Sequence, residues 1–325
     1  VFMGVAAERT KHIKLGTGVA SLPYHHPLML TNRMVLLDHL TRGRVMLGVG
    51  PGALVSDAYA LGIEPSLQRP RMDEAIGIIK RLLTETEPIT YESDWFTLRE
   101  ALIHLRPYTE PHFPMAVAAA QSPSGMVAAG KHGLGVLSVS VVRGGSIASN
   151  LGDFWKIAED TAEEYGQTVN RKDWRIVLHV HLADTKKEAM DQAREKSAAY
   201  QYDYFHQTMG TPFDYDGPKD KIINHMVDNG AWCVGTPDDL IEKIKELGEQ
   251  SGGFGGFMIQ ATEWGTREQV RHSYELIARY VMPHFQGSLD NLVTSQKWSE
   301  DHRDNLQALK TVSLSKATES YKNRT

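Results

Sequence analysis

The chain has 325 residues, of which 41% are hydrophobic and 23% are charged, a composition typical of a globular protein. Its 35 basic and 40 acidic residues give a net charge of -5 without any basic block, which argues against nucleic acid as the main partner. The single cysteine, Cys233, excludes an internal disulfide framework and a cysteine metal cluster, and it fits a reducing compartment. No apolar run approaches the roughly 18 residues that predict a membrane span.

The N-terminal stretch, VFMGVAAERT, begins with valine rather than an initiator methionine and has no signal-peptide pattern. Apolar residues at positions 1, 2, 5 and 6 predict a helix that is already under way at the first residue. We therefore expect the sequence to start inside a larger fold.

From residue 11 onward, apolar segments typical of strands alternate with segments of helical spacing. The predicted strands are residues 13–21, 44–50, 114–120, 133–140, 174–184 and 253–262. The predicted helices are residues 28–43, 69–84, 123–132, 146–166, 186–205, 237–250 and 267–281. Residues 88–105 alternate as a hairpin insertion would, Thr236 is expected to cap the helix that follows it, and residues 286–325 form a polar tail.

Strands separated by helices imply right-handed crossovers and a parallel sheet, either a doubly wound open sheet or a (β/α)8 barrel. Along the strand 174–184, the side chains of Val177, His179 and His181 share one face. Both faces of an open sheet should be apolar, so two histidines favour a barrel interior near a polar site. Histidines satisfied by hydrogen bonds in the core are the alternative, and a metal pair would need further ligands, which are not evident.

The stretch GVGPGA, residues 48–53, follows a predicted strand and formally matches the dinucleotide-binding fingerprint. That fingerprint requires a helix to begin at once, whereas a long irregular loop is expected here before the helix at Arg69. No acidic residue ends a second strand about 20 residues later, where ribose recognition would need it. A tight turn, or a functional loop after a barrel strand, is therefore favoured.

The stretch AAAQSPSG, residues 118–125, joins a buried strand to a helix of small residues. Ser122 is expected to cap this helix with Pro123 at its first position, which leaves the backbone N–H groups of Ser124 and Gly125 open to a ligand. The helix dipole adds positive potential there, so this end could bind a phosphate. A capped helix with nothing bound is the alternative.

Four stretches carry the most specific pattern: ERTKHIKLGTGVASLPYHHPLMLTNRMVLLDHLTRGRVMLGVGPG, AAAQSPSGMVAAGKHGLG, VGTPDDLIEKIKEL and YVMPHFQG. Together they resemble the bacterial luciferase-like family of flavin-dependent monooxygenases, and most of all its limonene 1,2-monooxygenase-type members. The resemblance implies a (β/α)8 TIM barrel over residues 1–285, with flavin at the carboxyl ends of the strands. It also implies that the six predicted strands are strands 3 to 8, and that the first two strands are absent from these 325 residues.

The resemblance further implies where the cofactor binds. Gly18 and Val19 match a pair that relatives join by a non-prolyl cis peptide beside the isoalloxazine ring. The loop from Gly50 to Ala53 matches the one around the ribityl chain and phosphate, although luciferase itself has an arginine where this chain has Pro51.

Phosphate binding is therefore expected to depend more on Ser122 and Gly125, which match phosphate contacts of the family. The full set of cofactor-binding positions implied by the resemblance is Thr17, Gly18, Val19, Gly50, Gly52, Ala53, Gln121, Ser122 and Gly125. No metal site is predicted.

His25 and His26 are the candidate catalytic residues, because they follow the strand of the cis pair on a loop that faces the site. A histidine there could stabilise a flavin peroxide or orient the substrate, and a surface loop shaped by its two prolines is the alternative. The histidine usually assigned a catalytic role in luciferases lies ahead of Val1. Trp264, just past the last strand, is expected either to line the substrate pocket or to pack against the terminal helices.

The resemblance implies a two-component monooxygenase that uses FMN, with FAD as an alternative, and a separate flavin reductase that supplies the reduced form. One oxygen atom of O2 would pass through a C4a-hydroperoxyflavin to a small apolar substrate of terpene type, as in limonene epoxidation. A cytoplasmic homodimer without membrane or nucleic-acid partners is expected.

Two alternatives remain open. One is a deazaflavin-dependent oxidoreductase on the same barrel, which transfers a hydride without oxygen. The other is a flavin-binding protein without catalysis, which becomes the better interpretation if the gene begins at Val1.

Overall fold

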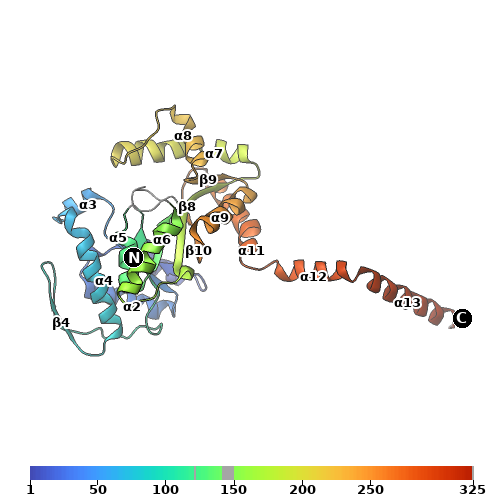
Figure 1. Cartoon of the computed structure of the whole chain (residues 1–325), viewed down its shortest axis with the longest axis horizontal. Coiled ribbons are helices and arrows are strands. Elements are labelled where there is room, and N and C mark those ends of the chain that lie inside the picture. The colour runs from blue at the N-terminus through green and yellow to red at the C-terminus, as the bar shows by residue number, and fades with distance from the viewer. Residues whose placement is uncertain (121, 141–149, 324–325) are drawn as a thin grey trace.

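The computed structural model describes residues 1–120, 122–140 and 150–323 (Figure 1). Within this part of the chain, one parallel sheet has the order β1-β3-β6-β7-β8-β10, with β2 also paired to β3 and β9 to β8. Its strands are β1 (Leu15–Gly16), β2 (Ala20–Ser21), β3 (Val45–Gly50), β6 (Met115–Ala119), β7 (Gly135–Val139), β8 (Trp174–Leu182), β9 (Trp232–Gly235) and β10 (Gly256–Gln260).

The two shortest strands, β1 and β2, are parts of one interrupted strand. Leu15 of β1 pairs with Val45, and Ala20 of β2 pairs with Val49 further along the same β3 strand. The six predicted strand segments are therefore all present in the sheet. The prediction of only six was wrong, because it missed β9, whose four buried residues lie directly before a strong helix signal.

The position of β9 follows from the pairing of His179. This residue of β8 pairs with Trp232 of β9 and with Gln260 of β10, so these two strands lie on opposite edges of β8. Strand β9 therefore continues the edge that β7 occupies up to Val177. The result is an α/β fold whose parallel sheet forms a half-barrel.

Eight longer helices accompany the sheet among the described residues 1–276. They are α1 (Phe2–Arg9), α2 (Pro27–Thr41), α4 (Gln68–Thr84), α5 (Ser124–His132), α6 (Leu151–Glu164), α7 (Lys186–Ala198), α9 (Pro237–Ser251) and α10 (Arg267–Leu276). Helix α2 packs on α4, α5 on α6, and α6 on α9, so these helices pack against one another in sequence. The helix predicted from residue 146 is seen from Leu151 onward, and residues 141–149 lie outside the description.

Shorter helical segments complete the chain. They are α3 (Val55–Ala60), α8 (Ile222–Asp228) and α11 (Met282–Phe285), the π-helices η4 (Ala199–Thr208) and η6 (Ile277–Val281), and the 3₁₀ turns η1 (Leu22–Tyr24), η2 (Pro65–Leu67), η3 (Arg171–Asp173) and η5 (Lys219–Lys221). Two of these correct the sequence analysis. The loop expected to be irregular up to Arg69 contains α3 and η2, and the helix predicted up to residue 205 changes to π-helical form after Ala198.

The outer side of the sheet forms the main hydrophobic core. Trp174 of β8 is fully buried and stacks on Trp155 of α6 with a ring-centroid distance of 4.8 Å. The indole nitrogen of Trp174 donates to the Ser138 hydroxyl on β7 at 2.8 Å, so its one polar group is satisfied. This contact holds the middle of the sheet to its helical layer.

The predicted hairpin is confirmed as β4 (Ile89–Glu92) and β5 (Thr97–Ala101), paired antiparallel. Glu74 of α4 holds it, because the carboxylate accepts hydrogen bonds from Tyr91, Ser93 and Trp95 at 2.8, 2.9 and 2.5 Å. Charge-assisted hydrogen bonds of this kind are stronger than neutral ones. The hairpin is therefore fixed to the helix layer.

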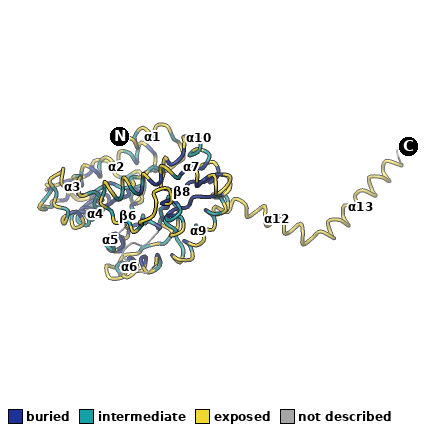
Figure 2. The backbone as a smooth tube through the Cα atoms, turned by 90° about the horizontal axis from the view of Figure 1, so that it is seen from above, coloured by how far each residue is buried: buried dark blue, intermediate teal, exposed yellow. Residues whose placement is uncertain are grey.

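The predicted polar tail consists of two helices, α12 (Asp290–Asp301) and α13 (Arg303–Lys322). They run away from the rest of the protein (Figure 1), and all their residues are exposed (Figure 2). In the described part of the chain, no helix is long and apolar enough to cross a membrane.

Candidate functional site

The interrupted strand β1–β2 carries the most unusual backbone in the molecule. The peptide bond between Gly18 and Val19 is cis although neither residue is proline, which confirms the prediction for this pair. The hydroxyl of Thr17 donates to the carbonyl oxygen of Gly48 on β3 at 2.6 Å. This bond joins the interrupted strand to β3 in the gap between β1 and β2, where the backbone pairing with β3 is interrupted.

Two glycines of β3 make this close approach possible. A Cβ on Gly48 would lie 2.1 Å from the carbonyl oxygen of Thr17, a distance that atoms cannot adopt. A Cβ on Gly50 would lie 2.6 Å from a methyl group of Val19. Both glycines are therefore required by the cis segment beside them.

The loop after β3 is connected to the histidine loop by a small polar network. The amide nitrogen of Gln68, a buried residue of α4, donates to the Tyr24 hydroxyl at 2.8 Å and to the carbonyl oxygen of Pro51 at 3.1 Å. Gly52 lies against both side chains with φ +94°, so any larger residue there would be strained and would collide with Tyr24. Ala53 is exposed at the rim of this loop.

The N-terminus of α5 gathers three polar side chains. The hydroxyls of Ser122 and Ser124 lie 2.8 Å apart, and Nε of Arg69 donates to the Ser124 hydroxyl at 3.3 Å. The first N–H groups of a helix have no partner within the helix and carry positive potential. A guanidinium, two hydroxyls and a helix N-terminus form the donor set that a phosphate group requires.

The predicted helix cap was wrong in detail. Helix α5 begins at Ser124, Pro123 occupies the cap position, and no side chain caps the helix. The Ser122 hydroxyl bonds instead to the Ser124 hydroxyl, which leaves the backbone donors of the first turn open. Gly125 lies in that turn, where a Cβ would meet the carbonyl oxygen of Ala118 at 2.4 Å. Gln121 lies outside the described residues.

Strand pairing brings these groups to one edge of the sheet. Ser21 pairs with Gly50, and Val49 pairs with Val117 two residues before β6 ends. Since neighbouring strands lie about 4.8 Å apart, the carboxyl ends of β2, β3 and β6 are adjacent. In parallel α/β folds, ligands bind at this edge.

The two candidate catalytic histidines differ in their surroundings. His26 is exposed, directly precedes α2, and its ring meets the edge of Phe96 from the hairpin at 5.7 Å. His25 is half-buried, and burial together with the nearby charge of Arg33 lowers its pKa. A neutral His25 imidazole at neutral pH can both donate and accept a hydrogen bond.

A second group of side chains lies at the carboxyl end of β8. Nε2 of His179 lies 3.0 Å from the Tyr200 hydroxyl, and the His179 ring stacks on Trp264 with a centroid distance of 5.8 Å. Trp264 is 3% exposed and also contacts Trp232, with ring centroids 4.5 Å apart. Trp264 therefore packs among aromatic rings, and it also lines a cavity of about 460 Å³ beside Tyr200.

The second histidine of β8, His181, is buried and its Nε2 lies 2.9 Å from the side-chain oxygen of Gln192. Burial lowers its pKa, so it is neutral near pH 7. Both histidines of the strand thus have hydrogen-bond partners, which agrees with the alternative of satisfied core histidines. Within the described residues, no group of three or more His, Cys, Asp and Glu side chains could hold a metal ion.

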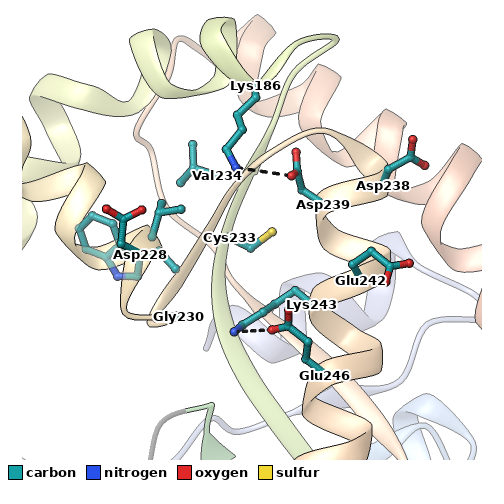
Figure 3. A pocket seen from close by; sticks show the side chains of 12 residues that line it. Lys186, Asp228, Gly230, Cys233, Val234, Asp238, Asp239, Glu242, Lys243 and Glu246 are labelled. Carbon is teal, nitrogen blue, oxygen red and sulfur yellow. Dashed lines mark hydrogen bonds and ion pairs between the residues drawn. The ribbon is translucent and has the colours of Figure 1, made fainter.

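A different pocket of about 410 Å³ lies between α7, β9 and α9 (Figure 3). Cys233 points into it. The ion pair Lys186–Asp239, whose Nζ and Oδ1 atoms are 3.6 Å apart, lies on one side of Cys233, and the ion pair Lys243–Glu246 lies on the other. Burial raises the pKa of the Cys233 thiol to about 12. The thiol is therefore protonated at neutral pH and is not a nucleophile.

The comparisons with known proteins identify the family. A family model described as luciferase-like monooxygenase matches residues 1–254. A 4-hydroxyprotoasukamycin monooxygenase of Streptomyces nodosus subsp. asukaensis is 43% identical over 300 residues, covering 92% of this chain and 81% of the relative. A limonene 1,2-monooxygenase of Rhodococcus erythropolis is 44% identical over 290 residues, covering 89% and 73% of the two chains.

Among solved structures, the oxygenating constituent of 3,6-diketocamphane monooxygenase from Pseudomonas putida is similar, with a TM-score of 0.68 and 25% identity. The match covers 86% of this chain and 82% of that one, which is a type II Baeyer-Villiger monooxygenase in complex with FMN. The chain belongs to the luciferase-like monooxygenase family. Its class of activity is that of a flavin-dependent monooxygenase.

Sequence reasoning missed several residues that the fold brings to the site. Arg69 and Gln68 are adjacent at the start of α4, yet they serve the N-terminus of α5 and the loop at Pro51. Tyr200 was missed because the sequence predicts an ordinary helix there, whereas the segment is a π-helix. Such π-helical segments are frequent at functional sites. The position of Arg69 at the first turn of a helix after a glycine loop was the one available signal.

We expect Gly48→Ala to lower the free energy of unfolding by about 2 kcal/mol, because the new methyl group must displace the Thr17 carbonyl. Urea unfolding followed by circular dichroism measures this. Gly248→Ala in α9 is the matched control, since no atom lies within 4 Å of its Cβ position, and it should raise stability by up to about 1 kcal/mol. Equal stabilities of the two variants would show that β3 tolerates a side chain at residue 48.

Proposed function

We propose that this chain binds FMN with the phosphate at the N-terminus of α5 and the isoalloxazine ring beside the cis pair Gly18–Val19. The observation that carries the proposal is the cluster of Arg69, Ser122 and Ser124 around that helix terminus. Arg69 supplies a positive charge at this helix terminus, whereas the loop after β3 has Pro51 where luciferase has an arginine. The donor set fits a dianionic phosphate, and the FMN complex of a relative with the same fold supports the choice of flavin.

The remaining cofactor contacts of the proposal come from the loops at the same edge. In this proposal, Gly50, Gly52, Thr17 and Ala53 border the path of the flavin chain. Gln68 holds Pro51 and Tyr24 in place, so the loop is shaped before the ligand arrives. Such preorganisation reduces the ordering that binding requires.

Bound reduced flavin supplies the electrons for activation of O2, of which one oxygen atom is transferred to the substrate. The protein positions the substrate and keeps water away. His25, neutral at neutral pH, can hold a hydrogen bond to a developing negative charge from the loop after β2. His179 and Tyr200 border the aromatic end of the site, where an apolar substrate would pack on Trp232 and Trp264.

The substrate class that we propose is a small apolar molecule of terpene type, which limonene represents. A separate flavin reductase supplies reduced FMN, and the enzyme works as a cytoplasmic homodimer. We also propose that residues 1–285 form the catalytic domain, and that the half-barrel belongs to a closed (β/α)8 barrel. The 44% identity to a limonene 1,2-monooxygenase supports the substrate class.

The phosphate contact can be tested by comparing FMN with riboflavin, which lacks the phosphate. We expect Arg69→Ala to weaken FMN binding by about tenfold or more, because a charge-assisted hydrogen bond contributes roughly 1.5–3 kcal/mol. Riboflavin binding should not change. Fluorescence titration measures both, and Arg81→Ala is the control because its guanidinium pairs with Glu85 at the far end of α4. Equal losses for both flavins, or no loss, would place the phosphate elsewhere.

The reaction can be tested with limonene and FMN kept reduced by an added flavin reductase in air. We expect limonene epoxide that carries one oxygen atom from ¹⁸O-labelled O2, as detected by mass spectrometry. Oxygen-independent turnover with a reduced deazaflavin would instead support hydride transfer. Tight FMN binding without oxygenation of any small apolar substrate would favour the non-catalytic alternative.

A further inference from the structure

Two neighbouring cavities share Tyr200 beyond the carboxyl end of β8. The smaller one, of about 90 Å³, lies between the ends of β7 and β8, the π-helix η4 and β9. The larger one, of about 460 Å³, lies between η4 and the loop that follows β10. Tyr200 and Gln260 line both cavities, and the two together are called the Tyr200 cleft here.

The smaller cavity is lined by two polar side chains that lack partners. Ser140 and Gln201 are each only 8% exposed. The backbone N–H of Ser140 donates to the Val177 carbonyl at 3.0 Å. Within the described part of the chain, however, neither the Ser140 hydroxyl nor the Gln201 amide has a hydrogen-bond partner. Both polar groups are therefore available to a molecule in the cavity.

The larger cavity adds two more such groups. Thr262 and Trp264 line it, and the hydroxyl oxygen of Thr262 and the indole nitrogen of Trp264 are shut off from solvent without a hydrogen-bond partner. Among the described residues, the only other side-chain polar atom in this state is Nε of Arg71. Four unpartnered polar groups thus gather around one cleft.

Such a concentration has a physical cost. Nearly all buried polar groups in native proteins have hydrogen-bond partners, because a group taken out of water loses its bonds to water. An ordered water can replace those bonds in the free protein. A ligand that displaces this water must then offer an equivalent polar atom, or it loses affinity. The cleft therefore favours a ligand with a hydrogen-bonding group at this end.

The matching group is neutral. Among the described residues, no Asp, Glu, Lys or Arg side chain lines the smaller cavity. Burial raises the pKa of the Tyr200 hydroxyl, so this group is also uncharged at neutral pH. A hydroxyl and an amide can each donate and accept a hydrogen bond. A carbonyl or hydroxyl oxygen of a ligand satisfies both of them.

The remaining walls of the cleft are apolar. The ring of Phe205 meets Tyr200 edge to face with a centroid distance of 5.0 Å, and Trp232 and Trp264 contact each other beside them. Val139 lines the smaller cavity as well. The cleft is therefore complementary to a compact apolar skeleton that carries a neutral oxygen.

We propose that the substrate bears a carbonyl or hydroxyl oxygen, which Ser140 and Gln201 bind in the smaller cavity while the apolar skeleton fills the larger one. The proposed function is presupposed here, because the ligand of the cleft is taken to be the substrate of the oxygenation. Both residues then determine specificity, since a site built to hydrogen-bond a substrate oxygen discriminates against the analogue that lacks it. The terpene-type class is thereby narrowed to members that already carry an oxygen, such as the ketone carvone, which has the carbon skeleton of limonene.

The variant Gln201→Met tests this pairing, because it keeps the length of the side chain and removes its hydrogen bonds. We expect carvone binding to weaken roughly three- to tenfold, the loss of one neutral hydrogen bond, while limonene binding stays unchanged or tightens. Equilibrium dialysis with oxidised FMN present measures both ligands without turnover. Gln207→Met is the matched control, because Gln207 is exposed in the same π-helix and lines neither cavity.

Ser140→Ala, which only removes an oxygen atom, should give the same selective loss of carvone binding. Equal weakening of both ligands would show that these residues merely shape the cleft, and the proposal would be wrong. Unchanged carvone binding in both variants, or no carvone binding to the unaltered protein, would overturn it too. A selective loss in a protein that oxygenates neither compound would refute the monooxygenase assignment and leave the oxygen-binding site in place.

The stability of the ligand-free protein gives a second readout. Because the Gln201 amide has no protein partner to lose, Gln201→Met should leave the midpoint of urea unfolding unchanged or move it to higher urea. Circular dichroism measures this shift against Gln207→Met. A clear loss of stability that is confined to Gln201→Met would show that the amide has a structural partner, which would contradict its role in substrate binding.

Discussion

The contact between the cis segment and strand β3 is the constraint on which the site depends. Thr17 donates to the Gly48 carbonyl, its own carbonyl lies where a Cβ of Gly48 would be, and Val19 occupies the space that a side chain at Gly50 would need. The backbone of β1–β2 can therefore change its course at Gly18–Val19 only because β3 has no side chains at these two points. The interrupted strand, the glycine loop and the end of β6 are thereby fixed at one edge of the sheet.

From that edge, the site extends in two directions with different chemistry. Toward α4 and α5 it offers cationic and hydroxyl donors, with Arg69 beside Ser124 at a helix terminus. Toward β8 and β10 it offers aromatic rings around the hydrogen-bonded pair His179 and Tyr200. A flavin has the same division, since its phosphate is charged and its ring system is planar and largely apolar. In the proposed FMN complex, a polar anchor is thus separate from an apolar space for the substrate.

Local signals in the sequence predicted most of the fold. Thr236 caps α9 as expected, and the structure adds a capping box with Asp239. The hairpin after α4 lies where alternation placed it. Strand β9 was missed because WCVG is short and uniformly buried, without the alternation or length that separates strands from helix ends. The helix cap at Ser122 was wrong because Pro123 already adopts helical angles, so the serine side chain turns to Ser124 instead.

The site was predictable where a motif is continuous in sequence and not where it depends on tertiary packing. The cis pair could be named because the continuous stretch GTGV resembles that of the family, and the cis bond is confirmed. Arg69 could not be assigned, because its partner Ser124 comes from another crossover and meets it only when α4 packs beside α5. The two C-terminal helices were not predicted either, because composition alone describes residues 286–325 as a polar tail.

The most direct measurement of the central claim is a crystal structure of the protein with FMN. The account predicts electron density for the phosphate within hydrogen-bonding distance of the Ser122 and Ser124 hydroxyls and the Arg69 guanidinium, and for the ring against Gly18–Val19. Phosphate density at any other helix terminus, or a ring bound away from the cis pair, would contradict it.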